Sequence, residues 1–313
     1  MISERIKALA ALTVERGQNA PASAFFQNLH RAALGLYAEC PQWEKIARSM
    51  AYAIANMPVH IYPEDTIGGR TYQNKPQPPE TVAADLDCDT PARAEFLAQY
   101  PEAELLFRDY LITGTAKGHI IWDFSRVLTL GITGLRTRFE DALAAARDED
   151  AEQFYRGVLI LLDAVLAFND KHIDAYRAAG MHELADRMAK VPRQPAETFR
   201  EAVQAFHMQH LCVMAENPYG GNGPGRLDYY LWPYLERDLA AGRCTLEEAK
   251  EIIDELFLRF DERLYGMDGW VEAVVIGGSP ATGGSAVNPL SYIMLDSIMD
   301  LDILHPSVYV RLP

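Results

Sequence analysis

A histidine in a glycine-spaced loop is the first residue whose type and setting could do chemistry. His119 follows Gly118 and stands just before Asp123, which we expect to cap a helix. A neutral imidazole at such a place can donate to, or accept from, a substrate hydroxyl or carbonyl. A histidine that bonds only to local backbone explains the position equally well.

Two further loops are rich in glycine. Residues 276–285 read IGGSPATGGS and place Gly278 and Ser279 where a predicted parallel strand ends, which is where α/β proteins collect ligands. The loop lacks the Gly-Lys-Ser/Thr ending of a phosphate loop, so a plain turn is the main alternative. Residues 216–226 hold Asn222 and Gly223, and they form either a simple connection or a binding loop in front of an aromatic helix.

Three charged residues complete the candidate set. Arg311 falls within an apolar strand pattern, and a buried charge there needs a carboxylate or an anionic ligand. Arg226 and Asp228 are close neighbours that favour a structural ion pair and capping arrangement over catalysis. No Ser-His-Asp order and no obvious nucleophile stand out, so the residues indicate binding groups only.

Metal binding is not indicated by the sequence. His207 and His210 lie three apart on a predicted helix, but no carboxylate has EF-hand or zincin spacing, so core positions are favoured. Cys212 lies in an apolar run and is expected to be a buried thiol. The cysteines form no CxxC pair, which suits a reducing cytoplasm. The four cysteines are Cys40, Cys88, Cys212 and Cys244.

Composition sets the broad class. The chain has 313 residues, of which 49% are hydrophobic and 23% charged, with a formal net charge of −15. The acidic balance argues against nucleic acid and against an anionic membrane surface as partners. The longest apolar stretch, 158–168, contains Asp163 and is too short to cross a bilayer. We expect a soluble cytoplasmic protein.

Helical patterns dominate the first two thirds of the chain. Capping-box spacing at Thr198 and Glu201, and again at Thr245 and Glu248, predicts two helix starts. Residues 57–69 are expected to be extended, and 73–83 to form a proline-rich surface excursion. Helices are expected over 3–16, 22–39, 41–57, 91–111, 124–147, 150–178, a short stretch to 190, 198–215 and 245–260.

The helix expected over 245–260 has an apolar stripe that predicts core packing. Strands are expected only near the C-terminus, over 271–276 and 307–312, with a helix over 289–301 between them. This order predicts a parallel, right-handed βαβ unit. A two-stranded sheet is unusually small for this number of helices, which indicates that the chain is the first part of a larger α/β structure. The stripe consists of Leu246, Ala249, Ile252, Ile253, Leu256, Phe257 and Phe260.

Several segments together resemble the glycyl radical enzymes, the family of pyruvate formate-lyase, glycerol dehydratase and choline trimethylamine-lyase. The segments fall in the family's order over about residues 45–312. They are MPVHIYPEDTIGG, GHIIWDFSRVLTLGI, TFREAVQAFHMQHL, GPGRLDYYLWPYLERDLAAGRCTLEEA, VVIGGSPATGGSAVNPLSYIMLDSI and PSVYVRL.

The resemblance implies an α/β fold, the N-terminal part of a ten-stranded barrel. Residues 1–195 would be its helical region and 196–313 the start of the barrel, within one large domain. The family's radical cysteine and glycine lie in the part that follows the PSVYVRL-like strand. The resemblance therefore implies a truncated chain that does not turn over substrate alone. A glycyl radical, installed by an S-adenosylmethionine iron–sulfur activase, is the implied cofactor of the complete enzyme.

The resemblance also assigns roles residue by residue. His119 matches a position that contacts a substrate hydroxyl in dehydratase-like members, where pyruvate formate-lyase has arginine. Asn222 or Gly223 falls near a polar substrate contact, whereas Asp123, Arg226 and Asp228 match scaffold positions. Ser279 and Arg311 complete the expected substrate-binding set, and no metal site is expected.

These roles predict thiyl-radical chemistry of the dehydratase or lyase type on a small metabolite. The implied partners are the substrate, the activating enzyme, a second copy in a homodimer, and possibly a second chain that supplies the missing half. Three alternatives stay open: cleavage of a 2-oxo acid as in formate acetyltransferase, a non-catalytic truncated barrel that binds a metabolite or partner chain, and a helical scaffold whose Gly/Pro loop binds a peptide.

Overall fold

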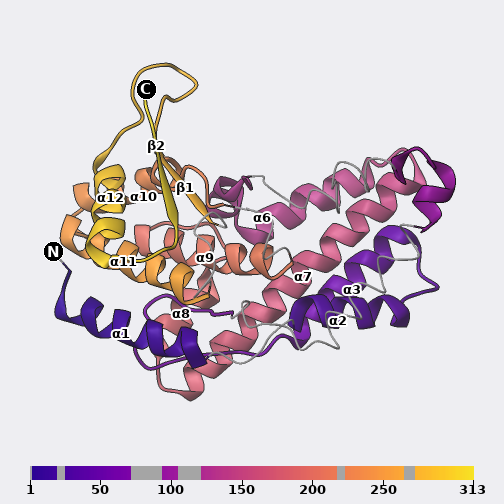
Figure 1. The fold of residues 1–313 in the computed structure, drawn as a ribbon, viewed down its shortest axis with the longest axis horizontal. Coiled ribbons are helices and arrows are strands. Elements are labelled where there is room, and N and C mark those ends of the chain that lie inside the picture. Colours follow the sequence, from indigo (N-terminus) through magenta and orange to yellow (C-terminus); the bar gives the residue numbers. More distant parts are fainter. Residues whose placement is uncertain (1, 20–24, 72–93, 105–120, 217–222, 264–271) are drawn as a thin grey trace.

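The protein is helix-rich with few strands, as the sequence predicts (Figure 1). The computed structural model describes residues 2–19, 25–71, 94–104, 121–216, 223–263 and 272–313. No helix within these ranges is long and apolar enough to cross a bilayer. The elements are α1 Glu4–Asn19, α2 Phe25–Leu36, α3 Gln42–Asn56, α6 Phe124–Ala144, α7 Glu149–Ala178, α8 His182–Lys190, α9 Phe199–Glu216, α10 Leu227–Ala240, α11 Leu246–Arg263, β1 Ala273–Gly277, α12 Pro289–Leu301 and β2 Ser307–Arg311.

The longest helix, α7, organises one half of the chain. Helices α3, α6 and α8 pack along it, and α2 packs on α3 (Figure 1). The side chain of Asp148 accepts the N–H of Ala151 at 2.8 Å and caps the start of α7. Gly180 follows its end with φ of 77°, a left-handed conformation that glycine adopts without strain.

The two strands are parallel, which confirms the predicted βαβ unit. Their register runs from Ala273 opposite Ser307 to Gly277 opposite Arg311. A third segment lies on the other edge of β1, where Gly225 forms a parallel bridge with Val274. In Figure 1 the strands lie beside α10 and α12. Three chain segments therefore run in the same direction, and their carboxyl ends meet at one edge.

Helix α9 joins two hydrophobic cores. Phe199, Val203 and Phe206 belong to a core shared with α1, α6, α10, α11, β1 and α12. Met208 and Cys212 belong to a second core built with α3, α7 and α8. Because α9 is buried on both sides, it fixes the helical half of the chain against the strands.

Several local predictions are confirmed. The Thr198 hydroxyl accepts the Glu201 N–H at 3.2 Å while the Glu201 carboxylate accepts the Thr198 N–H at 3.3 Å, and the box at Thr245 has the same pattern. Helix α12 occupies the predicted range, with Asn288 as its cap.

Two local predictions are wrong. Asp123 holds the cap position of α6, but its carboxylate accepts from the Ser125 hydroxyl and pairs with Arg126 at 2.6 Å, so it accepts no backbone N–H. Leu246 is 44% exposed and lies outside the core that the other members of its stripe enter. It sits at the first position of α11, where the helix has not yet reached its packing partners.

A buried charge network fixes the extended segment 58–71. Asp65 is 4% exposed and accepts both Nη1 of Arg70 at 2.8 Å and Nη2 of Arg259 at 2.8 Å. The Tyr176 hydroxyl donates to the same carboxylate at 2.7 Å. Burial and the neighbouring Asp65 raise the pKa of Tyr176, so its hydroxyl keeps its proton. One carboxylate therefore connects the segment to α7 and α11.

Carboxylates of α11 complete the network. Glu255 accepts the backbone N–H groups of Thr66 at 2.9 Å and Ile67 at 3.0 Å, and it also pairs with Arg259 at 2.9 Å. Glu262 accepts Nε of Arg70 at 2.7 Å. A segment without secondary structure buries unpaired backbone groups, and here side chains supply the missing partners.

Helix α9 contributes neutral groups to the same segment. Gln204 accepts the Gly68 N–H at 2.7 Å and donates to its carbonyl at 2.9 Å. Nε2 of His207 bonds to the Gly69 carbonyl at 3.1 Å. His207 and His210 are buried, which confirms their predicted core positions.

The substitution Asp65→Ala should cost about 3–5 kcal/mol in free energy of unfolding, because each of two buried guanidinium groups loses one of its carboxylate partners. Glu152→Ala is the matched control. Its ion pair with Arg156 joins side chains that are 47% and 59% exposed, and such pairs contribute at most about 1 kcal/mol. Denaturant unfolding of both variants measures the difference. Equal losses would contradict a structural role for the network.

Stability should fall as the pH drops below about 6.5. Burial lowers the pKa of His207 to about 3 and that of His172 to about 4. Between those values and 6.5 the unfolded chain binds protons that the folded chain does not, so acid favours unfolding. Each histidine contributes up to about 1.4 kcal/mol per pH unit. His207→Gln should flatten the curve of unfolding free energy against pH, and parallel curves for variant and parent would refute this.

Candidate functional site

The site lies where the three parallel segments end. Gly277 and Gly278 follow one another with φ of 75° and 79°, so the chain turns sharply after β1. The Gly278 N–H donates to the Arg311 carbonyl at 2.7 Å, which brings the end of β2 against this turn. A Cβ atom on Gly277 would lie 2.8 Å from that carbonyl, and only glycine fits such an approach.

Arg226 holds the turn from the third segment. Its Nη2 donates to the Gly277 carbonyl at 2.9 Å, and its Nη1 donates to the Ser279 carbonyl at 3.0 Å. The guanidinium lies 4.4 Å from the centre of the Tyr229 ring, a cation–π contact. One side chain therefore holds the carbonyl groups of the residues before and after Gly278.

Asp228 holds the same turn from the first turn of α10. Its carboxylate accepts the Gly277 N–H at 2.8 Å and the hydroxyl of Ser291. Burial raises the pKa of Asp228, while the bonds from Ser291 and Gly277 and the nearby Arg226 act in the other direction. Arg226 and Asp228 thus have separate partners, and bonds to the turn take the place of the predicted ion pair between them.

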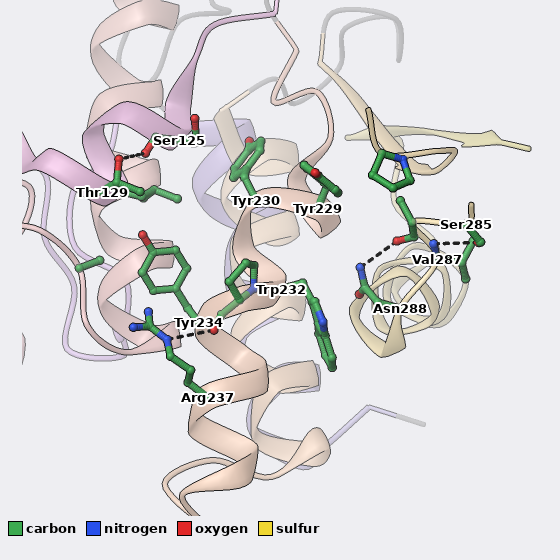
Figure 2. A pocket seen from close by; sticks show the side chains of 15 residues that line it. Ser125, Thr129, Tyr229, Tyr230, Trp232, Tyr234, Arg237, Ser285, Val287 and Asn288 are labelled. Atoms are coloured by element: carbon green, nitrogen blue, oxygen red, sulfur yellow. Dashed lines mark hydrogen bonds between the residues drawn. The ribbon is translucent and has the colours of Figure 1, made fainter. Parts of the chain in front are cut away.

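A pocket of about 730 Å³ adjoins the turn (Figure 2). Its walls come from the start of α6, from the aromatic face of α10, and from residues 280 and 285–288 after β1. In Figure 2 the rings of Tyr229, Tyr230 and Tyr234 stand between the α6 side chains Ser125 and Thr129 and the loop at Val287. The sequence analysis places these aromatic residues on a helix and assigns them no binding role. Their clustering next to the glycine loop was the signal for a pocket.

The structure brings two of the expected binding residues, Ser279 and Arg311, to the carboxyl ends of β1 and β2, and it places Gly223 at the start of β1. Gly223 packs against the backbone of Ala273, where a Cβ atom would lie 2.3 Å from the carbonyl oxygen. Ser279 follows the turn and is partly buried. Its hydroxyl makes no hydrogen bond to any residue within the described ranges. His119 and Asn222 lie outside the described residues.

Arg311 lies at the site, but it is exposed there and not buried as predicted. It ends β2 and is exposed, so the predicted burial is wrong. The neighbouring Val310 and Leu312 are 61% and 81% exposed, because β2 has β1 as its neighbour on one side only among the described residues. The side-chain carbons of Arg311 lie over Gly278, where a Cβ atom would be 2.8 Å from Cδ.

The described residues of the site supply binding groups and no reactive sulfur or metal centre. Cys212 lies in the second core, and burial raises the pKa of its thiol to about 12. Burial also raises the pKa of Cys244. No group of three metal-ligating side chains occurs in the part of the chain that the structure describes. The described cysteines therefore do not fit the role of a radical-carrying thiol at this edge.

These features define an α/β protein in which a pocket adjoins the carboxyl ends of parallel strands, the place where α/β proteins commonly bind ligands. Residues 89–313 match the family described as PFL-like, Pyruvate formate lyase-like, which is well over half of the chain. The chain therefore belongs to this family, the glycyl radical enzymes.

Curated relatives are lyases and dehydratases. The chain is 27% identical over 247 residues to the isethionate sulfite-lyase of Nitratidesulfovibrio vulgaris, which is 68% of this chain and 30% of that protein. It is 23% identical over 236 residues to the (2S)-3-sulfopropanediol dehydratase of Klebsiella oxytoca, which is 67% of this chain and 29% of that protein.

Solved structures share the fold. The glycerol-bound dehydratase from Clostridium butyricum superposes with a TM-score of 0.79 at 22% identity, over 100% of this chain and 48% of that chain. A glycyl radical enzyme from Archaeoglobus fulgidus has a TM-score of 0.80 at 22% identity, over 99% of this chain and 48% of that chain. The chain thus spans about half the length of these structures.

Asp228→Ala should destabilise the protein by about 2–4 kcal/mol, because it leaves the Gly277 N–H and the Ser291 hydroxyl buried without their acceptor. Asp123→Ala removes an exposed carboxylate near the same pocket and should cost under about 1 kcal/mol. Denaturant unfolding gives both values. Hydrogen exchange of the Gly277 amide should accelerate in Asp228→Ala alone, and unchanged exchange would contradict the proposed bond.

Proposed function

We propose that this chain is the N-terminal portion of a glycyl radical enzyme that acts on a small metabolite by thiyl-radical chemistry, as a dehydratase or lyase. The strands at 273–277 and 307–311 would belong to a ten-stranded barrel, with residues 1–195 as its helical region and 196–313 as its start. The observation that carries this proposal is the meeting of Ser279 and Arg311 at the carboxyl ends of β1 and β2, in a chain of this family.

The chain's own residues would bind and orient the substrate. The partly buried Ser279 hydroxyl is free to bond with a substrate hydroxyl or carboxylate. Arg311 supplies a positive charge at the same edge, suited to an anionic group. Arg226 and Asp228 hold the turn, so the Ser279 backbone is fixed before a ligand arrives.

His119 and Asn222 would complete the binding set. The support for His119 comes from Ile121, two residues further along the chain. A Cβ atom on Gly225 would lie 2.3 Å from Cγ2 of Ile121, so Ile121 packs against the segment beside β1. Asn222 directly precedes Gly223, which packs on that strand. His119 would therefore contribute a polar group near the segment beside β1, and Asn222 would contribute one near the start of β1.

The radical itself would come from outside these 313 residues. A glycyl radical, installed by an S-adenosylmethionine iron–sulfur activase, would supply the reactive hydrogen abstraction through a cysteine of the remaining part. That part would be a continuation of the chain or a second chain, and the complete enzyme would be a cytoplasmic homodimer. The exposed side chains of β2 support a missing part that covers this strand, because parallel strands are ordinarily covered on both faces.

Two alternatives are favoured by specific observations. The family match is also compatible with cleavage of a 2-oxo acid, as in formate acetyltransferase. The absence of a suitable cysteine among the described residues favours a non-catalytic truncated barrel that binds a metabolite or a partner chain.

The decisive experiment uses the complete product of the locus, expressed with its activase under anoxic conditions. Electron paramagnetic resonance should then show the doublet of a carbon-centred glycyl radical, because the family's chemistry starts there. A panel of isethionate, 1,2-propanediol, glycerol, and pyruvate with coenzyme A assigns the reaction class. Persistent spectral silence would support the non-catalytic protein, and formate from pyruvate would support the transferase.

The binding role of Ser279 is tested in the same activated protein. Ser279→Ala should lower kcat/KM by about tenfold or more, because a hydrogen bond to substrate is lost. The radical signal should stay at the level of the parent. Tyr292→Ala, which changes a side chain that is 63% exposed on α12, serves as the control. Equal kcat/KM for Ser279→Ala and the control would remove Ser279 from the binding set.

A further inference from the structure

A second pocket, of about 570 Å³, lies away from the strand edge and shares no residue with the first. It is bounded by Asp65 and Thr66 of the extended segment, by the start of α8, and by Arg187 and Arg200. We refer to it as the arginine pocket. Its lining residues come from the extended segment, the start of α8 and the first turn of α9. Helix α8 lies in the lower part of Figure 1.

Arg187 is a deeply placed cation in this pocket. Its side chain is only 10% exposed. Its Nη1 donates to the Thr66 carbonyl at 2.7 Å, and its Nη2 donates to Glu183 at 3.1 Å. A guanidinium has five N–H donors, so these two bonds leave several for a ligand.

Arg200 brings a second cation to the same cavity. It is partly buried in the first turn of α9, and it forms no hydrogen bond or ion pair with any residue inside the described ranges. Burial and then the nearby Arg200 lower the pKa of Arg187. Two guanidinium groups thus face one cavity, and Arg200 has no carboxylate partner among the described residues. A negatively charged ligand would relieve the repulsion between them.

The carboxylates near the pocket, Glu183 and Glu255 among them, compensate this positive charge only in part. Asp65 is engaged by Arg70 and Arg259 of the buried network. The Glu183 side chain is 92% exposed, so its ion pair with Arg187 is weak and easily displaced. Met181, the N-cap of α8, offers no side-chain acceptor, so the first N–H groups of that helix add to the positive potential.

We propose that the arginine pocket binds a small tetrahedral oxyanion of the phosphate type between Arg187 and Arg200. Arginine suits such a ligand because its planar fork bonds two oxygen atoms at once. The anion would connect the extended segment, α8 and α9, and so would stabilise their junction. Its source is either free phosphate or the phosphate group of a small metabolite.

The test is calorimetric titration of the full 313-residue chain with inorganic phosphate, at constant ionic strength set by sodium chloride. Saturable binding and a rise in the thermal midpoint are expected. Arg200→Gln should weaken binding by about tenfold or more, because a charge-assisted bond is lost. Arg156→Gln, an exposed arginine of α7, is the control and should bind as the parent does. Titration with glycerol 3-phosphate distinguishes the sources, since tighter binding than phosphate indicates a metabolite.

Two outcomes would overturn the proposal. One is phosphate binding in Arg200→Gln that equals the parent. The other is stabilisation by chloride alone that equals stabilisation by phosphate. Circular dichroism melting of Arg200→Gln without ligand shows whether the variant is folded. Arg200→Lys keeps the charge and should bind with intermediate affinity, which separates loss of the anion contact from loss of the fold.

Discussion

The structure depends on one buried carboxylate and the two arginines that neutralise it. Asp65 lies in a segment that has no helix or strand to satisfy its backbone, yet the segment passes through the interior. Arg70 and Arg259 hold the charge, and Glu255 accepts backbone N–H groups of the segment from α11. Burying these charges without partners would cost several kcal/mol each, so the set holds together or fails as a unit.

This network also determines where the strand edge lies. The segment bonds to Gln204 and His207 on α9, and α9 packs through Phe206 into the core that contains β1. The turn after β1 is then held by Arg226 and Asp228. A continuous chain of contacts thus runs from α7 through α9 to the turn, and a loss at Asp65 would loosen the scaffold that positions the edge.

Local chemistry made much of the fold predictable from the sequence. The boxes at Thr198 and Thr245 and the cap at Asn288 are set by residues within one turn of each helix, and their spacing alone identified them. The network was not predictable, because Asp65 and Arg259 are distant in the chain. The exposure of Arg311 was not predicted, because the apolar pattern of β2 indicates a strand buried by its neighbours. Among the described residues, β1 is the only strand paired with β2, and it leaves the end of β2 exposed.

Part of the candidate site could likewise be predicted from the sequence, and part could not. The sequence places Ser279 directly after a predicted parallel strand. Ligands commonly bind at the ends of such strands in α/β sheets, so Ser279 could be named as a candidate. The bonds from Arg226 to the carbonyls of Gly277 and Ser279 depend on how the third segment lies alongside β1, which no spacing in the sequence reveals. Those bonds leave the Ser279 hydroxyl as the group that can still respond to a ligand. A turn that is fixed through its backbone and has one side-chain hydroxyl without a described partner has the preorganisation that a binding site needs.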